Sequence, residues 1–288
     1  MLFALNRILN YAGVRKTIAD LHITILLMRR AEMDFLWKDP NNDAYFQRDE
    51  NKYLTKVDQL NDKANAMINT LNETSAIKEL SLKDTIQQAQ QLLEEYFTAF
   101  HAIVDLRRNR GCINRDHEKE FSKAIRALEE SRFAKEKILM TSLRSYEQNF
   151  LLNKDEAYIE EFDVALASFK KHLQLSGASA ELISTLENYD NEFHTLAQIE
   201  KTIGFTDEDG VNGKLEKSIH KIEPLIEKLS TVIVAHAQEG VNNTYIVLAA
   251  LLFVQLIIEF ILCISFAGQE SEQFNHLDKV SPQAQAPI

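Results

Sequence analysis

Apolar side chains recur every three to four residues over most of the chain, a spacing typical of helices with one buried face. Polar and charged residues fill the positions between them. The clearest stripes are Leu21, Ile25, Met28, Glu32 and Phe35; Ile86, Ala89, Leu92, Leu93, Tyr96, Phe97 and Phe100; and Leu182, Leu186, Tyr189, Phe193 and Leu196. The pattern predicts an all-α fold in which most aromatic side chains pack in the core.

One stretch near the C-terminus is apolar on every face. Between residues 245 and 266 only Gln255, Glu259 and Ser265 are polar, and the length is about that needed to cross a bilayer. We predict a transmembrane helix over 243–267; the alternative is a buried helix of a soluble core. Gln255 and Glu259 fall on one helix face, which indicates that this helix packs against another.

The helices are expected to be long, because the chain contains only 8 Gly and 4 Pro. Breaks are predicted at 39–43, 72–75, 109–111, 176–179 and 206–213. Ser81 is predicted to cap the helix that follows the second break. A short disordered tail is expected over 268–288, where the sequence becomes polar and contains Pro.

The chain contains an internal repeat. Arg-x-x-Glu-x-x-Phe-Leu occurs at residues 29–36 and again at 144–151, and Tyr-x-x-x-Phe-His occurs at 96–101 and at 189–194. Gly111 and Gly204 follow the second pair at the same distance. Because these matched motifs occur in the same order in both halves, they indicate a tandem duplication, with units of about 1–130 and 131–242.

One repeat unit would leave its apolar stripe exposed, so the two copies are expected to pack together. Four antiparallel helical columns, each interrupted midway, would form two stacked four-helix bundle modules. We therefore predict an all-α domain over 1–242 made from a duplicated helical unit, followed by one C-terminal transmembrane helix.

Charge and motifs exclude several function classes. The net charge of −11 and the lack of a basic stripe argue against nucleic acid as a partner. The two cysteines, Cys112 and Cys263, are not expected to pair, because Cys263 lies in the apolar segment. The residues that open the chain do not form a signal peptide.

Enzymatic chemistry is not indicated either. Glu-x-x-His, Cys-x-x-Cys, a phosphate-binding loop and a nucleophile elbow are all absent from the sequence. We predict no enzyme activity, no cofactor and no metal. A metal held by the repeat-related pair His101 and His194 is the weakest hypothesis, because no carboxylate spacing supports it.

Three stretches resemble the helical bimodular sensor domain of bacterial chemoreceptors (methyl-accepting chemotaxis proteins) and of some sensor histidine kinases. Residues 28–36 are similar to its Met-Arg-Arg-x-Glu-Lys-Asp-Phe-Leu motif, residues 143–151 form a weaker echo, and residues 210–223 are similar to its Gly-Leu-x-Gly-x-Leu-Arg-x-x-Val-His-x-Val-Glu pattern. The resemblance covers roughly residues 5–242 and extends into the apolar segment.

The resemblance implies an extracytoplasmic sensor in the inner membrane, with the helical domain in the periplasm, acting as a homodimer. It would bind a small molecule such as an organic acid or an amine and transmit a helix displacement across the membrane. As given, the chain is expected to lack the signalling domain. The alternatives are the input domain of a sensor histidine kinase and a membrane-tethered helical scaffold that binds a protein.

The candidate ligand-binding residues are Arg29, Arg30, Arg144 and His220. Arginine suits a carboxylate pocket because its planar fork carries a permanent charge. The competing interpretation is that these arginines bridge glutamates between helices, and that His220 is an ordinary interface residue. Glu216 stands where the family pattern has arginine, which weakens the organic-acid prediction and leaves room for an amine or a neutral ligand.

Overall fold

The computed structural model describes residues 2–37 and 51–280, and within these ranges every regular element is a helix. Their order is α1 (Leu2–Trp37), α3 (Lys52–Glu73), α4 (Ser75–Glu79), α5 (Lys83–Glu129), η1 (Ala134–Glu136), α6 (Lys137–Asn153), α7 (Ala157–Leu175), α8 (Ala180–Ile203) and α9 (Gly210–Val280). The predicted all-α class is confirmed.

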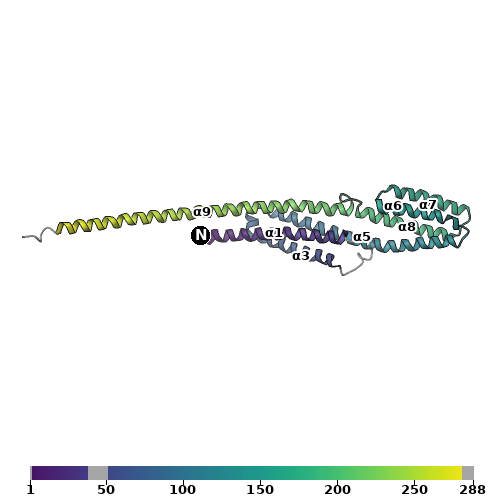
Figure 1. Cartoon of the computed structure of the whole chain (residues 1–288), viewed down its shortest axis with the longest axis horizontal. Coiled ribbons are helices and arrows are strands. Elements are labelled where there is room, and N and C mark those ends of the chain that lie inside the picture. Colours follow the sequence, from purple (N-terminus) through teal and green to yellow (C-terminus); the bar gives the residue numbers. More distant parts are fainter. Residues whose placement is uncertain (1, 38–50, 281–288) are drawn as a thin grey trace, which may run out of the picture. The chain divides into compact units, whose positions relative to one another are not determined.

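The chain divides into two compact units. The larger is Thr17–Leu229, and the smaller combines Met1–Lys16 with Ser230–Ile288. In the smaller unit Tyr11, Val14 and Ile233 are buried. Helix α9, which runs from green to yellow in Figure 1, contributes to both units.

Helix α9 contains the one stretch in the described residues that is long and apolar enough to cross a membrane. Apart from the partly buried Leu248, the large apolar side chains of residues 245–262 are exposed rather than packed inside the protein. This exposure contradicts the alternative of a buried helix of a soluble core. Gln255 and Glu259 form a hydrogen bond of 3.1 Å along the helix, and their packing against another helix stays a prediction.

A continuous hydrophobic core joins the C-terminal half of α5 to α6, α7 and α8, which lie side by side in Figure 1. Its centre is aromatic: the ring centroids of Phe162 and Phe193 are 4.2 Å apart, and Phe150 meets Phe193 edge to face at 5.9 Å. The stripe predicted at residues 182–196 supplies one wall of this core.

Helix α5 is uninterrupted, so the break predicted at 109–111 is wrong. Gly111 is buried in the middle of this helix. Glycine weakens a helix by only about 1 kcal/mol relative to alanine, which the packing on both sides outweighs. The actual turn between α5 and α6 lies around η1. The prediction for Ser81 is also wrong, because Ser81 has a positive φ and Leu82 occupies the N-cap position.

The other predicted breaks have mixed outcomes. Those at 72–75 and 176–179 are confirmed, and Ser179 caps α8 by accepting a hydrogen bond from the Leu182 amide. The break at 39–43 lies outside the described residues. The tail expected from residue 268 is helical as far as Val280 in the structure, and the rest of it lies outside the described residues.

The break between α8 and α9 requires a glycine. Gly204 ends α8 with φ of 103°, and Asp209 closes the loop by accepting hydrogen bonds from the amides of Phe205 and Thr206. The loop is shorter than the predicted 206–213, because α9 already begins at Gly210. Gly111 and Gly204, matched in sequence, therefore have different conformations.

Replacing Gly204 by alanine should destabilise the protein by about 1–3 kcal/mol, because the new Cβ would overlap the backbone of Asp209 at a φ that favours glycine. Gly240→Ala is the control. A Cβ there meets nothing within 4 Å in the middle of α9, so this variant should be stabilised by up to about 1 kcal/mol. Thermal unfolding of both variants, followed by circular dichroism, measures the difference in stability. Equal changes in melting temperature would contradict the conclusion that position 204 requires glycine.

Candidate functional site

The first Arg-x-x-Glu motif lies in a charged network between three helices. The Glu32 carboxylate on α1 is buried and accepts a 2.6 Å hydrogen bond from the Tyr96 hydroxyl on α5. Arg29, one turn before it, lies 3.5 Å from Glu32 and donates to both carboxylate oxygens of Glu216 on α9 at 2.6 Å. One arginine thus joins a buried and a partly buried carboxylate.

The second motif builds the same network. The buried Glu147 carboxylate on α6 accepts a 2.8 Å hydrogen bond from the Tyr189 hydroxyl on α8. Arg144 contacts Glu147 and also Glu118 on α5. Its guanidinium lies 5.1 Å from the ring centre of Phe121. Both networks therefore place an arginine between two glutamates. In each, a tyrosine hydroxyl donates a hydrogen bond to the buried glutamate, which we call the inner glutamate.

The match between the halves extends to the neighbouring aromatic and histidine side chains. Phe35 meets Phe100 edge to face at 5.7 Å, as Phe150 meets Phe193 at 5.9 Å. A histidine directly follows Phe100 and Phe193 in the sequence, and each histidine contacts an aspartate on the adjacent helix. The two pairs are His101 with Asp58 and His194 with Asp163, both at 2.9 Å.

One residue that differs between the two repeats makes the two networks electrostatically different. His117, which precedes Glu118, is fully buried; its Nε2 lies 2.7 Å from Glu147, and its ring stacks on Tyr189 at 4.6 Å. The residue that precedes Glu216 in the first network is Leu215. Sequence comparison of the repeats missed His117, because no polar residue in the other half corresponds to it.

The pKa values of the two inner glutamates shift in opposite directions. Burial raises the pKa of Glu32 to about 6, and this outweighs the opposing effects of Tyr96 and Arg29. Burial also acts to raise the pKa of Glu147, but contacts with His117 and Arg144 together bring it below its ordinary value. The second network therefore favours a charged carboxylate more strongly than the first.

The four predicted ligand-binding residues do not converge on one place. Arg29 and Arg144 have the carboxylate partners that the interhelix interpretation expects. Arg30 points to solvent. His220 has a 73% exposed side chain and lies 3.8 Å from Glu216. A ligand contact by any of the four stays a prediction.

A third buried carboxylate was not predicted from the sequence. Glu200 on α8 is held by Arg110 Nε at 2.8 Å and by Lys154 Nζ at 2.6 Å. Lys154 follows α6 in a left-handed conformation with φ of 55°. Burial lowers the pKa of Lys154, with Arg110 and Arg107 contributing in the same direction and Glu200 opposing them. This group sits beside the break predicted at 109–111 and holds α5, α6 and α8 together.

A groove of about 520 Å³ that could admit a small molecule lies between α5 and α9 in the larger unit. Glu94 and Glu95 lie on its α5 side, and lysines 214, 217 and 221 lie on its α9 side. Small side chains, including Ala99 and Ser218, line the space between them. Such a groove can attract a carboxylate, an amine, or a molecule that has both.

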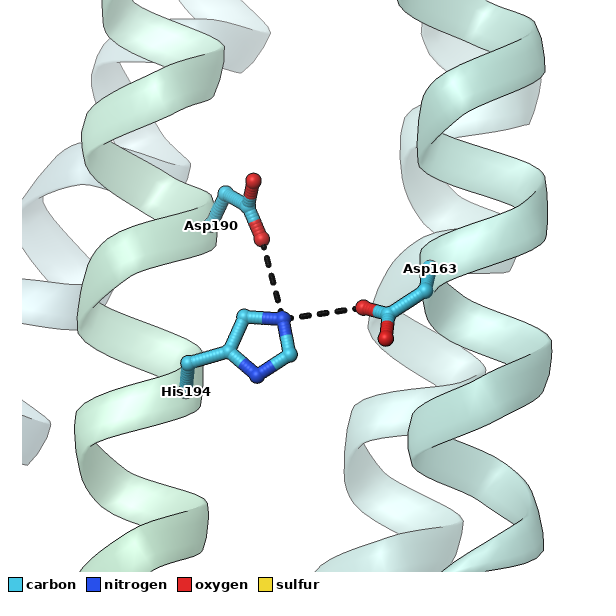
Figure 2. Close-up of side chains that lie close together, drawn as sticks. All are labelled: Asp163, Asp190 and His194. Carbon is cyan, nitrogen blue, oxygen red and sulfur yellow. Dashed lines mark hydrogen bonds and ion pairs between the residues drawn. The ribbon is translucent and has the colours of Figure 1, made fainter.

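Figure 2 shows the described side chains that come closest to a metal-binding group. Asp163 on α7 and Asp190 on α8 both approach Nε2 of His194, at 2.9 and 3.2 Å. Their ligand atoms lie within 4.8 Å of one another, as a bound cation would require. Lys170 Nζ, however, lies 3.0 Å from Asp190. One of the two carboxylates therefore already has a cationic partner. His101, the other member of the predicted pair, lies with Asp58 instead.

Comparison of the chain with protein-family models, curated proteins and solved structures found no match.

Tyr96→Phe should cost about 1.5–3 kcal/mol, because it removes a hydrogen bond from a buried carboxylate. Tyr189→Phe is the matched control and should cost less, since Glu147 keeps both Arg144 and His117. Denaturant unfolding of the two variants at neutral pH measures the difference. An equal loss of unfolding free energy in both variants would contradict the conclusion that the Glu147 carboxylate is better stabilised than the Glu32 carboxylate.

Stability should depend on pH through Glu32. Since its pKa is raised from 4.5 to about 6 in the folded protein, the folded state holds a proton that the unfolded state loses. The free energy of unfolding should therefore fall by on the order of 1–2 kcal/mol as pH rises through this interval. Glu32→Gln should abolish that fall in denaturant unfolding at pH 4.5 and 7. Glu147→Gln should instead remove a stabilisation that the wild type loses as pH falls below 4.5.

Proposed function

We propose that this chain is the extracytoplasmic ligand-sensing region of a bacterial transmembrane chemoreceptor, of the helical bimodular type. Its helical domain would lie in the periplasm, anchored in the inner membrane by residues 243–267. It would bind a small molecule, without catalysis, and transmit a helix displacement across the membrane.

The observation that carries this proposal is the course of α9. The helix contributes Glu216 to the first charged network and lysines to the groove, and the same helix includes the apolar residues 245–262. A ligand that altered the position of residues 214–221 would act on the element that enters the membrane. Small displacements are transmitted when an element has two discrete arrangements of its contacts.

The two networks support a finer arrangement, with two stacked four-helix modules from a duplicated unit. In this proposal the first module takes α1, α3, the start of α5 and the start of α9. The second takes the rest of α5 with α6, α7 and α8. The fourth helix of each repeat would then complete the module of the other repeat, as the contacts of Glu118 with Arg144 and of Glu216 with Arg29 indicate.

The groove is the first place to look for the ligand, because Arg29 and Arg144 are already paired with carboxylates. Its three lysines suit an organic acid, and Glu94 and Glu95 add a place for an ammonium group. Glu216 makes the first network a poor carboxylate site, since it already neutralises Arg29. A molecule with both a carboxylate and an amine fits this charge distribution best.

A membrane-tethered scaffold is the second candidate. It is favoured by the aromatic core of α5 to α8, which leaves little polar space inside that half. The input domain of a sensor histidine kinase would use the same contacts as a chemoreceptor.

The test is thermal unfolding of the full chain in lipid nanodiscs with a panel of amino acids, organic acids and amines. A ligand present at 100 times its dissociation constant should add about 2.7 kcal/mol of stability. Lys214→Ala with Lys217→Ala should abolish the shift in melting temperature without changing the melting temperature of the unliganded protein.

Three control variants distinguish a ligand contact by the arginines from a structural role in pairing with glutamates. Arg30→Ala tests a predicted ligand contact at an exposed residue. Arg29→Ala and Arg144→Ala should lower the melting temperature without ligand, because each leaves a buried carboxylate without its arginine. A well-folded protein that responds to no compound would support the scaffold instead.

A further inference from the structure

One histidine and two aspartates on α7 and α8 have the spacing of metal ligands (Figure 2). Nε2 of His194 lies 2.9 Å from Oδ1 of Asp163 and 3.2 Å from Oδ1 of Asp190. Among the described residues, this is the one group of three such side chains whose ligand atoms all lie within 4.8 Å of one another. In a tetrahedral zinc site with bonds of about 2.0–2.2 Å, neighbouring ligand atoms are roughly 3.3 Å apart. The two distances to Nε2 are close to that spacing.

The group has more acceptor atoms around Nε2 than hydrogens to share among them. Nε2 of His194 carries at most one hydrogen, whereas a carboxylate oxygen from each aspartate faces it. One hydrogen can point well at only one of these oxygens. A divalent cation placed among the three atoms would contact all of them and would balance the two negative charges. The arrangement is therefore one that a divalent cation completes.

The contact with Lys170 does not occupy the Asp190 oxygen that faces the histidine. Lys170 Nζ lies 3.0 Å from Oδ2 of Asp190, whereas Oδ1 is the atom near Nε2. Carboxylates that bind a metal are themselves hydrogen-bonded by neighbouring groups, which fix their orientation. Lys170 comes from α7 and Asp190 from α8, so this contact also holds the two helices in the alignment that the group requires.

The aromatic core positions the histidine ring. Its centroid lies 5.7 Å from the ring of Phe193 and 6.4 Å from that of Phe162, and both phenylalanines are fully buried. The histidine side chain itself is 44% exposed, and those of Asp163 and Asp190 are 49% and 26% exposed. A ring that rests on a packed core and faces solvent with its Nε2 is held in place and remains accessible to an ion.

The corresponding histidine of the first repeat has a different neighbour. His101 contacts Asp58 at 2.9 Å, as His194 contacts its aspartate on α7. The residue four positions before the histidine is Phe97 in the first repeat and Asp190 in the second. The Phe97 ring packs against His101, with centroids 4.5 Å apart. The second repeat therefore has a carboxylate, in place of a ring, at the position that completes three ligands.

We propose that Asp163, Asp190 and His194 bind one divalent transition-metal ion, and that Zn²⁺ fits the site best. Imidazole combined with carboxylate suits zinc, whereas magnesium and calcium prefer oxygen ligands alone. The ion would take the place of the Nε2 hydrogen and fasten α7 to α8. This site departs from the expectation of no metal, which rested on the absence of Glu-x-x-His. In Asp-x-x-x-His the ligands are four residues apart, and that spacing also puts both on one helix face.

A titration with Co²⁺, a coloured substitute for zinc, tests the proposal. The full chain is held in phosphatidylcholine nanodiscs, with Cys112→Ser to remove an exposed thiol. This parent protein should bind one Co²⁺ per chain with a change in visible absorption. Zn²⁺ should displace the Co²⁺ and raise the melting temperature. Asp163→Asn, Asp190→Asn and His194→Gln should each weaken binding by about tenfold or more, since each removes a ligand.

Asp58→Asn and His101→Gln are the matched controls, because they alter the equivalent pair of the first repeat. Both should leave the affinity and the number of bound ions unchanged. Circular dichroism of every variant checks that the helical fold is kept. A folded parent protein that shows no Co²⁺ absorption, or equal affinities in the site variants and the controls, would overturn the proposal. The metal site and the ligand-sensing proposal are independent, so failure of one leaves the other standing.

Discussion

The alignment of the helices depends on two carboxylates, Glu32 and Glu147, which are buried at equivalent places in the two halves among mainly apolar side chains. A charged carboxylate without partners is too costly in such a place, so its neighbours must supply hydrogen bonds and positive charge. An arginine one turn earlier and a tyrosine from a neighbouring helix do so in both halves. Helix registers that would separate these groups are thereby penalised, which gives a long, uniform helical surface a defined alignment.

The same network is adjusted differently in the two halves. His117 gives Glu147 a third partner, while Leu215 leaves Glu32 with two. The pKa values move apart for this reason: burial dominates for Glu32, whereas its neighbours dominate for Glu147. Duplication supplies two equivalent sites, and their neighbours raise the pKa of one buried glutamate above its ordinary value and lower that of the other.

The proposed function draws these features together through two helices. Helix α9 carries Glu216 and one wall of the groove, and it also contains the apolar segment. Helix α1 carries Arg29 and Glu32 towards the interior. In the proposed function, ligand and membrane would therefore both act on the pair of helices that Arg29 and Glu216 join.

The sequence by itself determined the helical class, the apolar segment and the equivalence of the Arg-x-x-Glu motifs, because periodicity and spacing are local properties of the chain. It did not determine that α5 runs through Gly111, since the preference of one glycine is smaller than the packing around it. Only the tertiary structure decided that Glu118 and Glu216 complete the networks and that His117 enters one of them. These residues come from helices distant in sequence, and their contacts depend on which faces the folded helices bring together.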